Sequence, residues 1–432
     1  MDALLNITLW GNEVAVVIWD KETTSATVEF YESFATKRLD IAPLTMPLED
    51  IVRGERTFSF PSHRGKTFKG LPGMLADSLP DDYGNKILDE WFAGKGMSLS
   101  TLTPLDRLCY VGKRGMGALE YEPAHTDKAL NESSRIEIEQ LMALAKDVLN
   151  QREAFRADIR EENKAISDIL RVGTSAGGAK PKAIIAWNEA SDEVRSGQVR
   201  APEGFSYWLL KFDGIEDRSL KDNPQGIGRI EYAYYKMAKD CGIHISESRL
   251  LEERDFAHFM TKRFDRTDSG EKLHTQTLCA IAHFDRDGRY SYEQAFQVMR
   301  RLHLSYAEME EMYRRMAFNV IARNHDDHTK NHSFIMNARG EWRLAPAYDL
   351  CYSYSPEGKW TSRHQMSLNN KRDEFTYSDL ISVAKNSGIR NAGQLIEQII
   401  DTVSQWSKYA SEAGVNSLHI KQIAPTLRLL RP

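Results

Sequence analysis

The chain changes its secondary-structure pattern twice along its length, and this order restricts the folds that it can adopt. The first 125 or so residues read as short strands separated by turns, including a hairpin over 6–19 that turns at Gly11-Asn12. Strands then alternate with helices to about residue 265, and a mostly helical pattern follows. The sequence therefore predicts an α+β protein with a β-rich subdomain at 1–125, a small mixed lobe at 126–265 and a larger helical lobe at 266–432, and we expect a ligand cleft between the two lobes.

The helical part is predicted from long apolar periodicities. Residues 306–323 form one strong helical pattern, and residues 394–410 form another. Upstream, strands are expected over 183–187, 207–212 and 258–264, with a helix over 229–241 that ends at Gly242.

Composition and charge exclude several classes of protein. The 432 residues include 57 Lys and Arg against 62 Asp and Glu, a net charge of −5, and 41% are hydrophobic. Long disordered stretches and coiled-coil rods do not have this composition, and an acidic chain lacks the positive field needed to grip nucleic acid over its whole surface. The apolar runs are far shorter than the ~20 residues of a membrane span. No signal peptide or zinc-ligand cysteine spacing is present, so we expect a soluble cytoplasmic protein without a membrane partner.

The densest polar segment is Arg323-Asn-His-Asp-Asp-His-Thr-Lys-Asn-His332, between an apolar helix and a short strand over 333–336. The five-residue spacing from Asp326 to Asn331 is that of a phosphoryl-transfer loop, in which the Asp orients the acceptor hydroxyl and the Asn holds Mg²⁺. Counting from Asp327 gives a spacing of four, which does not fit. A hairpin turning at 337–340 is expected to bring Asp349 beside Asn331 as the second Mg²⁺ ligand, because Mg²⁺ prefers hard oxygen ligands.

Two other interpretations of this segment stay open. One is a solvated loop with helix caps. The other is a metal-dependent hydrolase in which His325, His328 and His332 bind the metal with Asp326 or Asp327.

A kinase interpretation also requires a loop that binds phosphates and a lysine on a strand. The small-residue loop Gly173–Lys182 contains Gly177 and Gly178, whose backbone N–H groups can approach phosphate oxygens closely. It matches neither of the common phosphate-loop motifs, and a simple hairpin turn is the alternative. Lys211 is the one charge in the strand Trp208–Phe212, and Glu231 in the next helix is its candidate ion-pair partner. Alternatively, Lys211 is a lysine at a sheet edge whose charged end reaches solvent, and Glu231 is an exposed carboxylate on a helix face.

Several segments together resemble the HipA family of bacterial toxin kinases. They lie in the family's order and span nearly the whole chain, at 70–80, 108–119, 174–182, 261–266, 324–331, 344–350 and 366–376. The resemblance implies a serine/threonine protein kinase with a two-lobed, protein-kinase-like core that uses ATP and Mg²⁺. It also implies the toxin of a type II toxin–antitoxin pair, whose partners are a small helix-turn-helix antitoxin (HipB-like), operator DNA bound mainly through that antitoxin, and a protein substrate. The best-known relatives phosphorylate an aminoacyl-tRNA synthetase.

The resemblance also assigns roles by position. Asp326 is the catalytic base, Asn331 and Asp349 hold Mg²⁺, and Lys211 contacts the ATP phosphates, while the main chain around Lys262–Phe264 meets the adenine as a hinge. Further residues implied in ATP binding are Ala176, Gly177, Gly178, Glu231, Lys262, Phe264, His328 and Lys330.

Ser175 aligns with the serine that the family autophosphorylates, and a phosphate there would exclude the loop from the nucleotide site because its charge repels the ATP phosphates. Alternatively, Ser175 only contributes a hydroxyl to a turn. The chain departs from the family at Asp327, where members often have Gly; this second carboxylate either helps hold metal or faces solvent. A catalytically silent co-repressor is a further hypothesis, although the intact Asp326, Asn331 and Asp349 set argues against it.

Overall fold

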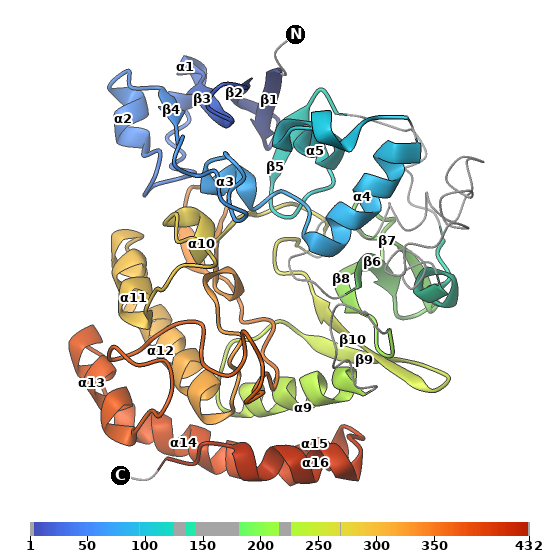
Figure 1. Cartoon of the computed structure of the whole chain (residues 1–432), viewed down its shortest axis with the longest axis vertical. Coiled ribbons are helices and arrows are strands. Elements are labelled where there is room, and N and C mark those ends of the chain that lie inside the picture. Colours follow the sequence, from blue (N-terminus) through green and yellow to red (C-terminus); the bar gives the residue numbers. More distant parts are fainter. Residues whose placement is uncertain are drawn as a thin grey trace. The chain divides into compact units, whose positions relative to one another are not determined.

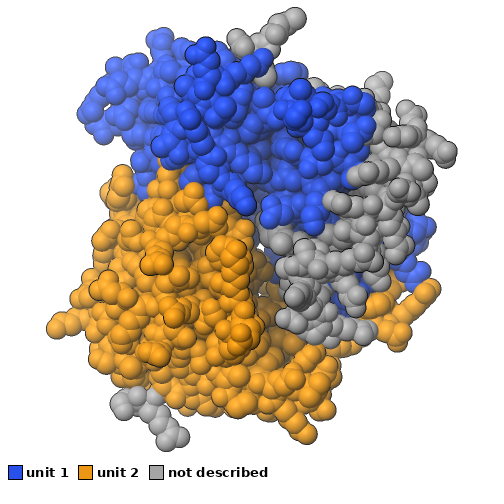
Figure 2. Space-filling view, in the orientation of Figure 1, with its two compact units in different colours: residues 1–225, 260–276, 336–341 blue, residues 226–259, 277–335, 342–432 orange. Residues whose placement is uncertain are grey.

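The computed structural model describes residues 4–94, 96–124, 135–143, 181–215, 226–267 and 269–430. Its chain divides into two compact units, drawn in two colours in Figure 2. Unit 1 comprises residues 1–225, 260–276 and 336–341, and unit 2 comprises residues 226–259, 277–335 and 342–432. The sequence-based domain boundaries at 125 and 265 stay predictions. Ser175, Ala176, Gly177 and Gly178 lie outside the described residues.

The N-terminal part of unit 1 is a five-stranded sheet in the order β4-β3-β2-β1-β5 (Figure 1). Its strands are β1 (Leu4–Leu9), β2 (Asn12–Asp20), β3 (Ser25–Phe30), β4 (Thr57–Ser59) and β5 (Leu119–Glu122). The predicted first hairpin is present, but its turn lies at Trp10 and Gly11, both with positive φ, one residue before the predicted Gly11-Asn12, because Asn12 already pairs with Leu9. Alternate residues of β1 are fully buried, as expected for a strand with one face in a core. The helices of this region are α1 (Glu32–Ala35), α2 (Leu48–Val52), α3 (Gly73–Ala76), α4 (Asp82–Gly94) and α5 (Pro104–Val111), with a 3-10 turn, η1 (Leu99–Thr101).

Unit 1 also contains the antiparallel strands β6 (Lys182–Asn188), β7 (Glu193–Ser196) and β8 (Ser206–Lys211). β6 pairs with both of the others, and Lys182 lies directly across from Lys211. The Lys182 side chain is 6% exposed, and its Nζ atom is 3.2 Å from Oδ2 of Asp81, which is equally buried. Asp81 precedes α4 and accepts a hydrogen bond from the Gly84 N–H of that helix at 2.6 Å. The ion pair therefore attaches the start of β6 to the start of α4.

Unit 2 is mainly helical, as predicted. Its helices are α9 (Ile227–Asp240), α10 (Leu278–Ile281), α11 (Tyr292–Arg301), α12 (Tyr306–Ile321), α13 (Tyr377–Ser387), α14 (Ala392–Ser404), α15 (Trp406–Glu412) and α16 (Ser417–Ile423), followed by η4 (Ala424–Thr426). α9 packs against α14 and α15 (Figure 1). The strands of unit 2 are β9 (Ser248–Glu253), most of β10 (Phe256–Lys262), most of β12 (Ser333–Met336) and β13 (Trp342–Leu344), and β9 and β10 neighbour each other. β11 (His274–Thr277) belongs to unit 1 except for its last residue. Among the described residues, no helix is long and apolar enough to span a membrane.

The prediction of one continuous helix over 394–410 is wrong. α14 ends at Ser404 and α15 begins at Trp406, because Gln405 between them has φ −87° and ψ 16°, outside the helical region. The break lets the Trp406 ring enter the core, where it is 1% exposed and packs edge-on against Tyr234 at a centroid distance of 5.5 Å.

Candidate active site

The polar segment that follows α12 is held at its start by the helix itself. Asn324 donates through Nδ2 to Oδ1 of Asn319 at 2.9 Å, and its backbone N–H donates to the Asn319 carbonyl at 2.9 Å. Arg323, between them, has φ 59°, in the left-handed region. The chain therefore leaves the helix in a sharp turn, and the following loop contains Asp326. A short 3-10 turn, η3 (Thr329–Asn331), then leads directly into β12.

Asp326 and Asn331, the two ends of the predicted spacing, are in direct contact. Asn331 donates a hydrogen bond from Nδ2 to the backbone carbonyl of Asp326 at 2.7 Å. This bond uses the nitrogen of the amide, so the oxygen, Oδ1, is the atom that Asn331 can offer to a cation. The Asp326 side chain is 45% exposed, and His328 approaches it with Nε2 at 3.8 Å from Oδ1.

The charge of Asp349 acts on the carboxyl group of Asp326. The surrounding protein removes water from Asp326 and raises the pKa of its carboxyl, and the negative charges of Asp349 and Asp327 raise the pKa further, while His328 and Arg286 oppose the shift. Burial lowers the pKa of His328 and is opposed by Asp326 and Asp349. Asp349 has φ 57°, a left-handed conformation that costs energy outside glycine and often occurs at functional sites. Within unit 2, Asp326 thus interacts with His328, with Asn331 and with the charge of Asp349.

Asp327 does not face solvent; its side chain is fully buried. Its Oδ2 accepts hydrogen bonds from Tyr292 Oη at 2.8 Å and from His364 Nδ1 at 2.9 Å. Its Oδ1 accepts from the backbone N–H groups of Gln365 at 2.7 Å and Met366 at 3.3 Å. Burial works against the charge, but these donors and the nearby His364 hold the pKa of Asp327 below its ordinary value. Asp327 is therefore an anchor between the loop and the segment 364–366, and the predictions that it helps hold metal or faces solvent were wrong.

The anchor extends to the helix that precedes the loop. The Tyr292 hydroxyl, which donates to Asp327, also accepts a hydrogen bond from Asn319 Nδ2 at 3.0 Å. Sequence reasoning missed Tyr292, Asn319 and His364. The partners of Asp327 lie 35 to 39 positions away along the chain, and no short-range pattern reports such a pairing.

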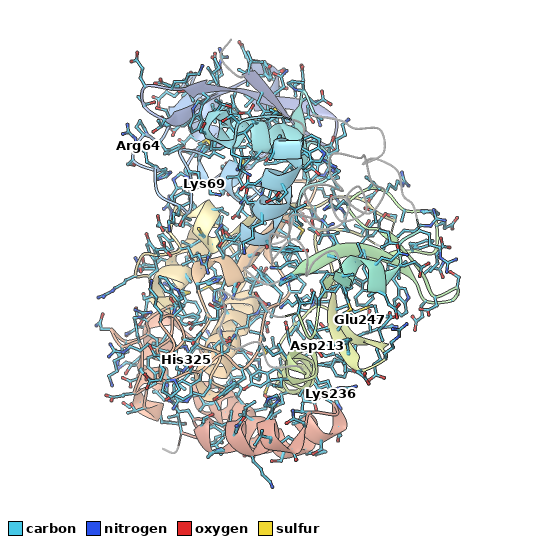
Figure 3. All side chains as sticks on the ribbon, turned by 45° about the vertical axis from the view of Figure 1, so that its right-hand side comes forward. Arg64, Lys69, Asp213, Lys236, Glu247 and His325 are labelled. Atoms are coloured by element: carbon cyan, nitrogen blue, oxygen red, sulfur yellow. The ribbon has the colours of Figure 1, made fainter. Side chains whose placement is uncertain are left out.

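The three histidines of the segment do not converge. His325, labelled in Figure 3, contacts the Thr361 carbonyl through Nδ1 at 3.0 Å and lies with its ring 4.1 Å from that of His364. His332 is buried with its ring against Tyr292, whereas His328 faces Asp326. Burial lowers the pKa of His325 to about 3 and that of His332 to about 4. Among the described residues, no three His, Cys, Asp or Glu side chains are arranged to hold a metal ion, and the divergent rings do not favour the hydrolase hypothesis.

The other residues predicted to bind ATP are divided between unit 1 and unit 2, and each is described within its unit. In unit 1, Lys211 ends β8, while Lys262 and Phe264 are partly exposed. In unit 2, Lys330 lies in η3, where its carbonyl accepts a hydrogen bond from Tyr348 at 2.6 Å. Glu231 is 4% exposed in α9, so it is not the exposed helix carboxylate of the alternative interpretation. The ATP-binding roles of these residues stay predictions.

The predicted hinge segment carries a buried charge network in unit 1. Asp265 is fully buried and accepts hydrogen bonds from Arg263 Nε at 2.8 Å and Nη2 at 2.7 Å, from Arg266 Nη1 at 2.8 Å and from the Gly117 N–H at 2.7 Å. Arg266 also donates to the carbonyls of Gly115 and Gly117, both at 3.0 Å. Burial opposes the charge, but the two arginines hold the pKa of Asp265 well below its ordinary value. Asp265 and Arg266 therefore point inward and tie this segment to the N-terminal region.

Comparisons with known proteins agree with this arrangement. A family model described as the HipA-like C-terminal domain matches residues 174–407, and one described as the HipA N-terminal domain matches residues 5–122. A Haemophilus influenzae protein named "Putative kinase" is 23% identical over 305 residues, which cover 62% of this chain and 84% of that protein. A Sinorhizobium fredii protein named "Putative kinase Y4dM" is 26% identical over 214 residues, 46% of this chain and 49% of the relative.

A solved structure shows the same fold over almost the whole length. It is the complex of HipA, HipB and operator DNA from the toxin–antitoxin system of Shewanella oneidensis, and the match has a TM-score of 0.60 with 16% identity, covering 99% of this chain and 92% of the solved chain. The predicted fold class, a kinase-like α+β core preceded by a β-rich region, is confirmed. Because the two family models together extend from residue 5 to residue 407, this chain belongs to the HipA family.

Proposed function

We propose that this protein transfers the γ-phosphoryl group of ATP to serine or threonine hydroxyls of proteins. The observation that carries the proposal is the arrangement around Asp326. This carboxylate is partly exposed and lies in one loop with Asn331, whose amide binds the Asp326 carbonyl. The charge of a second carboxylate, Asp349, also acts on Asp326. Such an arrangement can orient an acceptor hydroxyl beside a cation bound to a nucleotide.

Asp326 would accept the proton of the acceptor hydroxyl. As the new O–P bond forms on the acceptor oxygen, the bond from the γ-phosphorus to the bridging oxygen breaks and ADP leaves. The raised pKa of Asp326 favours this role, because it brings the carboxylate closer in basicity to the working pH. The hydrogen bond from Asn331 to the Asp326 carbonyl keeps the loop in the shape that presents the carboxylate.

The donor set fits Mg²⁺. Asn331 offers an amide oxygen and Asp349 a carboxylate, both hard ligands of the kind that Mg²⁺ takes in phosphoryl-transfer enzymes. The ion, when bound, would neutralise charge on the ATP phosphates. The left-handed backbone at Asp349 is consistent with a residue held for this purpose.

We assign the phosphate-contacting lysine to Lys211 and not to Lys182, its neighbour across the strands. Lys182 is 6% exposed and is paired with Asp81. A lysine committed to a buried carboxylate is a poor ligand for a mobile nucleotide. We also retain Glu231 as an ATP-site residue, and the main chain of Lys262–Phe264 as the adenine hinge.

The biological role follows by analogy with the relatives. The Shewanella oneidensis protein occurs with HipB and operator DNA. We propose that this chain is likewise the toxin of a type II pair, held by a small helix-turn-helix antitoxin that carries most of the DNA contact, since a net charge of −5 disfavours extended DNA binding by the chain itself. A protein of translation, such as an aminoacyl-tRNA synthetase, is the proposed target.

Incubation of the full chain with labelled ATP and Mg²⁺ tests the activity, and we expect label on Ser175. Ser175→Ala should abolish self-labelling, whereas Thr174→Ala, which removes the neighbouring hydroxyl, should keep it. Phosphopeptide mass spectrometry identifies the site. A folded protein that labels neither itself nor any protein of a bacterial lysate would rule out the kinase.

A further inference from the structure

We propose that an arginine rim beside Asp326 binds acidic residues that flank the acceptor hydroxyl in the protein substrate, so that the enzyme selects acidic sequence contexts. The rim consists of Arg286, Arg289, Arg363 and Arg372. The inference rests on the proposed kinase function and names the substrate class of the same site.

Hydrogen bonds join the first rim segment to the catalytic loop. Thr329 donates from Oγ1 to the carbonyl of Phe284 at 3.3 Å, two residues before Arg286. The charge of Arg286 acts on both Asp326 and His328. The side chain of Arg286 is exposed, so it is available to a ligand that reaches Asp326.

The other rim segments are joined to this one and to the loop. The backbone N–H of Ser367 donates to the carbonyl of Tyr290 at 2.9 Å, beside Arg289. His364, beside Arg363, contacts Asp327 at 2.9 Å, and the carbonyl of His364 accepts a hydrogen bond from Arg372 Nε at 2.6 Å. The rim and the catalytic loop are therefore parts of one hydrogen-bonded structure.

The positive charge of the rim is only partly offset within the described part of the chain, where Asp326 acts on Arg286 and Asp327 acts on Arg372. None of its four arginines forms an ion pair there, and Arg286, Arg289 and Arg363 are exposed. Burial lowers the pKa of Arg372, and the charges of Arg289 and Arg363 lower it further, while the charge of Asp327 opposes these shifts. Because these carboxylates only partly offset the repulsion between the arginines, an anionic ligand would relieve it further.

The chemistry favours a short acidic protein segment over a nucleic acid. Guanidinium groups bind carboxylates in a bidentate geometry, and clusters of arginines are a recurrent means of recognising acidic motifs. The acceptor hydroxyl must lie at Asp326, so its own neighbours in sequence are the groups that reach the rim. A long polyanion would also meet the rest of a chain with net charge −5.

Two synthetic peptides with one central serine, flanked either by Asp and Glu or by Lys and Arg, test the proposal on the full chain. We expect kcat/KM to be about tenfold or more higher for the acidic peptide, a difference of about 1.4 kcal/mol. Arg289→Glu with Arg363→Glu should abolish or invert this preference and leave the KM for ATP and the self-labelling rate within about twofold of wild type, since only electrostatic complementarity to the peptide changes.

Lys385→Glu with Lys421→Glu is the matched control. It changes the net charge equally at exposed lysines in the helices α13 and α16. It should keep the acidic preference, and fluorescence anisotropy of the labelled acidic peptide without ATP should show weaker binding only for the arginine variant.

Transfer to both peptides without an acidic preference would overturn the inference and leave the kinase intact. Equal losses in the two double variants would overturn it too, as would a rim variant that loses binding to a duplex DNA or RNA probe while its peptide preference is unchanged. Absence of any transfer, including self-labelling, would overturn both proposals together.

Discussion

Asp326→Asn is expected to reduce phosphoryl transfer by about 10²–10⁴-fold, because the amide cannot accept the proton of the acceptor hydroxyl. The substitution keeps the size of the side chain. The carboxylate is partly exposed, and its closest ion-pair contact is His328 at 3.8 Å, so the folded state loses little when the charge is removed. Single-turnover transfer from labelled ATP measures the first effect, and chemical denaturation measures the second.

The neighbouring substitution Asp327→Asn is the matched control and should behave differently. Asp327 is fully buried and accepts from Tyr292, His364 and two backbone N–H groups. An amide nitrogen placed against donors leaves buried groups unsatisfied, at a cost of about 1–3 kcal/mol in the free energy of unfolding. A transfer rate near that of wild type in Asp326→Asn, or equal stability losses in the two variants, would contradict these roles.

Asp265→Asn is expected to give the largest loss of stability, about 3–5 kcal/mol. It leaves Arg263 and Arg266 buried without their shared carboxylate, and an uncompensated buried charge is costly. The same variant should loosen the contact with the Gly115–Gly117 backbone, since Asp265 also binds the Gly117 N–H. Urea denaturation followed by circular dichroism measures the change in unfolding free energy.

Glu49→Gln is the corresponding control at an exposed ion pair. Glu49 and Arg53 pair on the surface of α2, with side chains 72% and 63% exposed, and such pairs contribute little. We expect an unfolding midpoint indistinguishable from that of wild type. If Asp265→Asn were as stable as Glu49→Gln, the buried network would not hold this segment.

Local patterns predicted much of the fold and the central loop. The hairpin over β1 and β2 follows from turn chemistry, and β12 has the bounds expected from the sequence, 333–336. Helix α12 was expected over 306–323 and spans Tyr306–Ile321, because its apolar periodicity extends over several turns. The Asp326–Asn331 contact was also predictable, since both residues lie in one short loop.

Contacts between distant parts of the chain could not be predicted. The sequence of residues 394–410 favours helix throughout, whereas the structure breaks the helix at Gln405, directly before the buried Trp406. Asp265 binds Gly117, which is 148 positions away, and Asp327 binds a segment 38 positions downstream. Sequence spacing contains no information on such pairs, so the structural roles of these two carboxylates became apparent only in three dimensions.

The proposed phosphoryl transfer requires Asn331 and Asp349 to share one magnesium ion beside ATP. The most direct test is a crystal structure of the protein with Mn²⁺ in place of Mg²⁺ and a non-hydrolysable ATP analogue, with the ion located by its anomalous scattering. We predict an anomalous peak at a bonding distance of roughly 2.1 Å from both Asn331 Oδ1 and a carboxylate oxygen of Asp349. A bound nucleotide whose metal ion contacts neither residue would contradict the proposed mechanism.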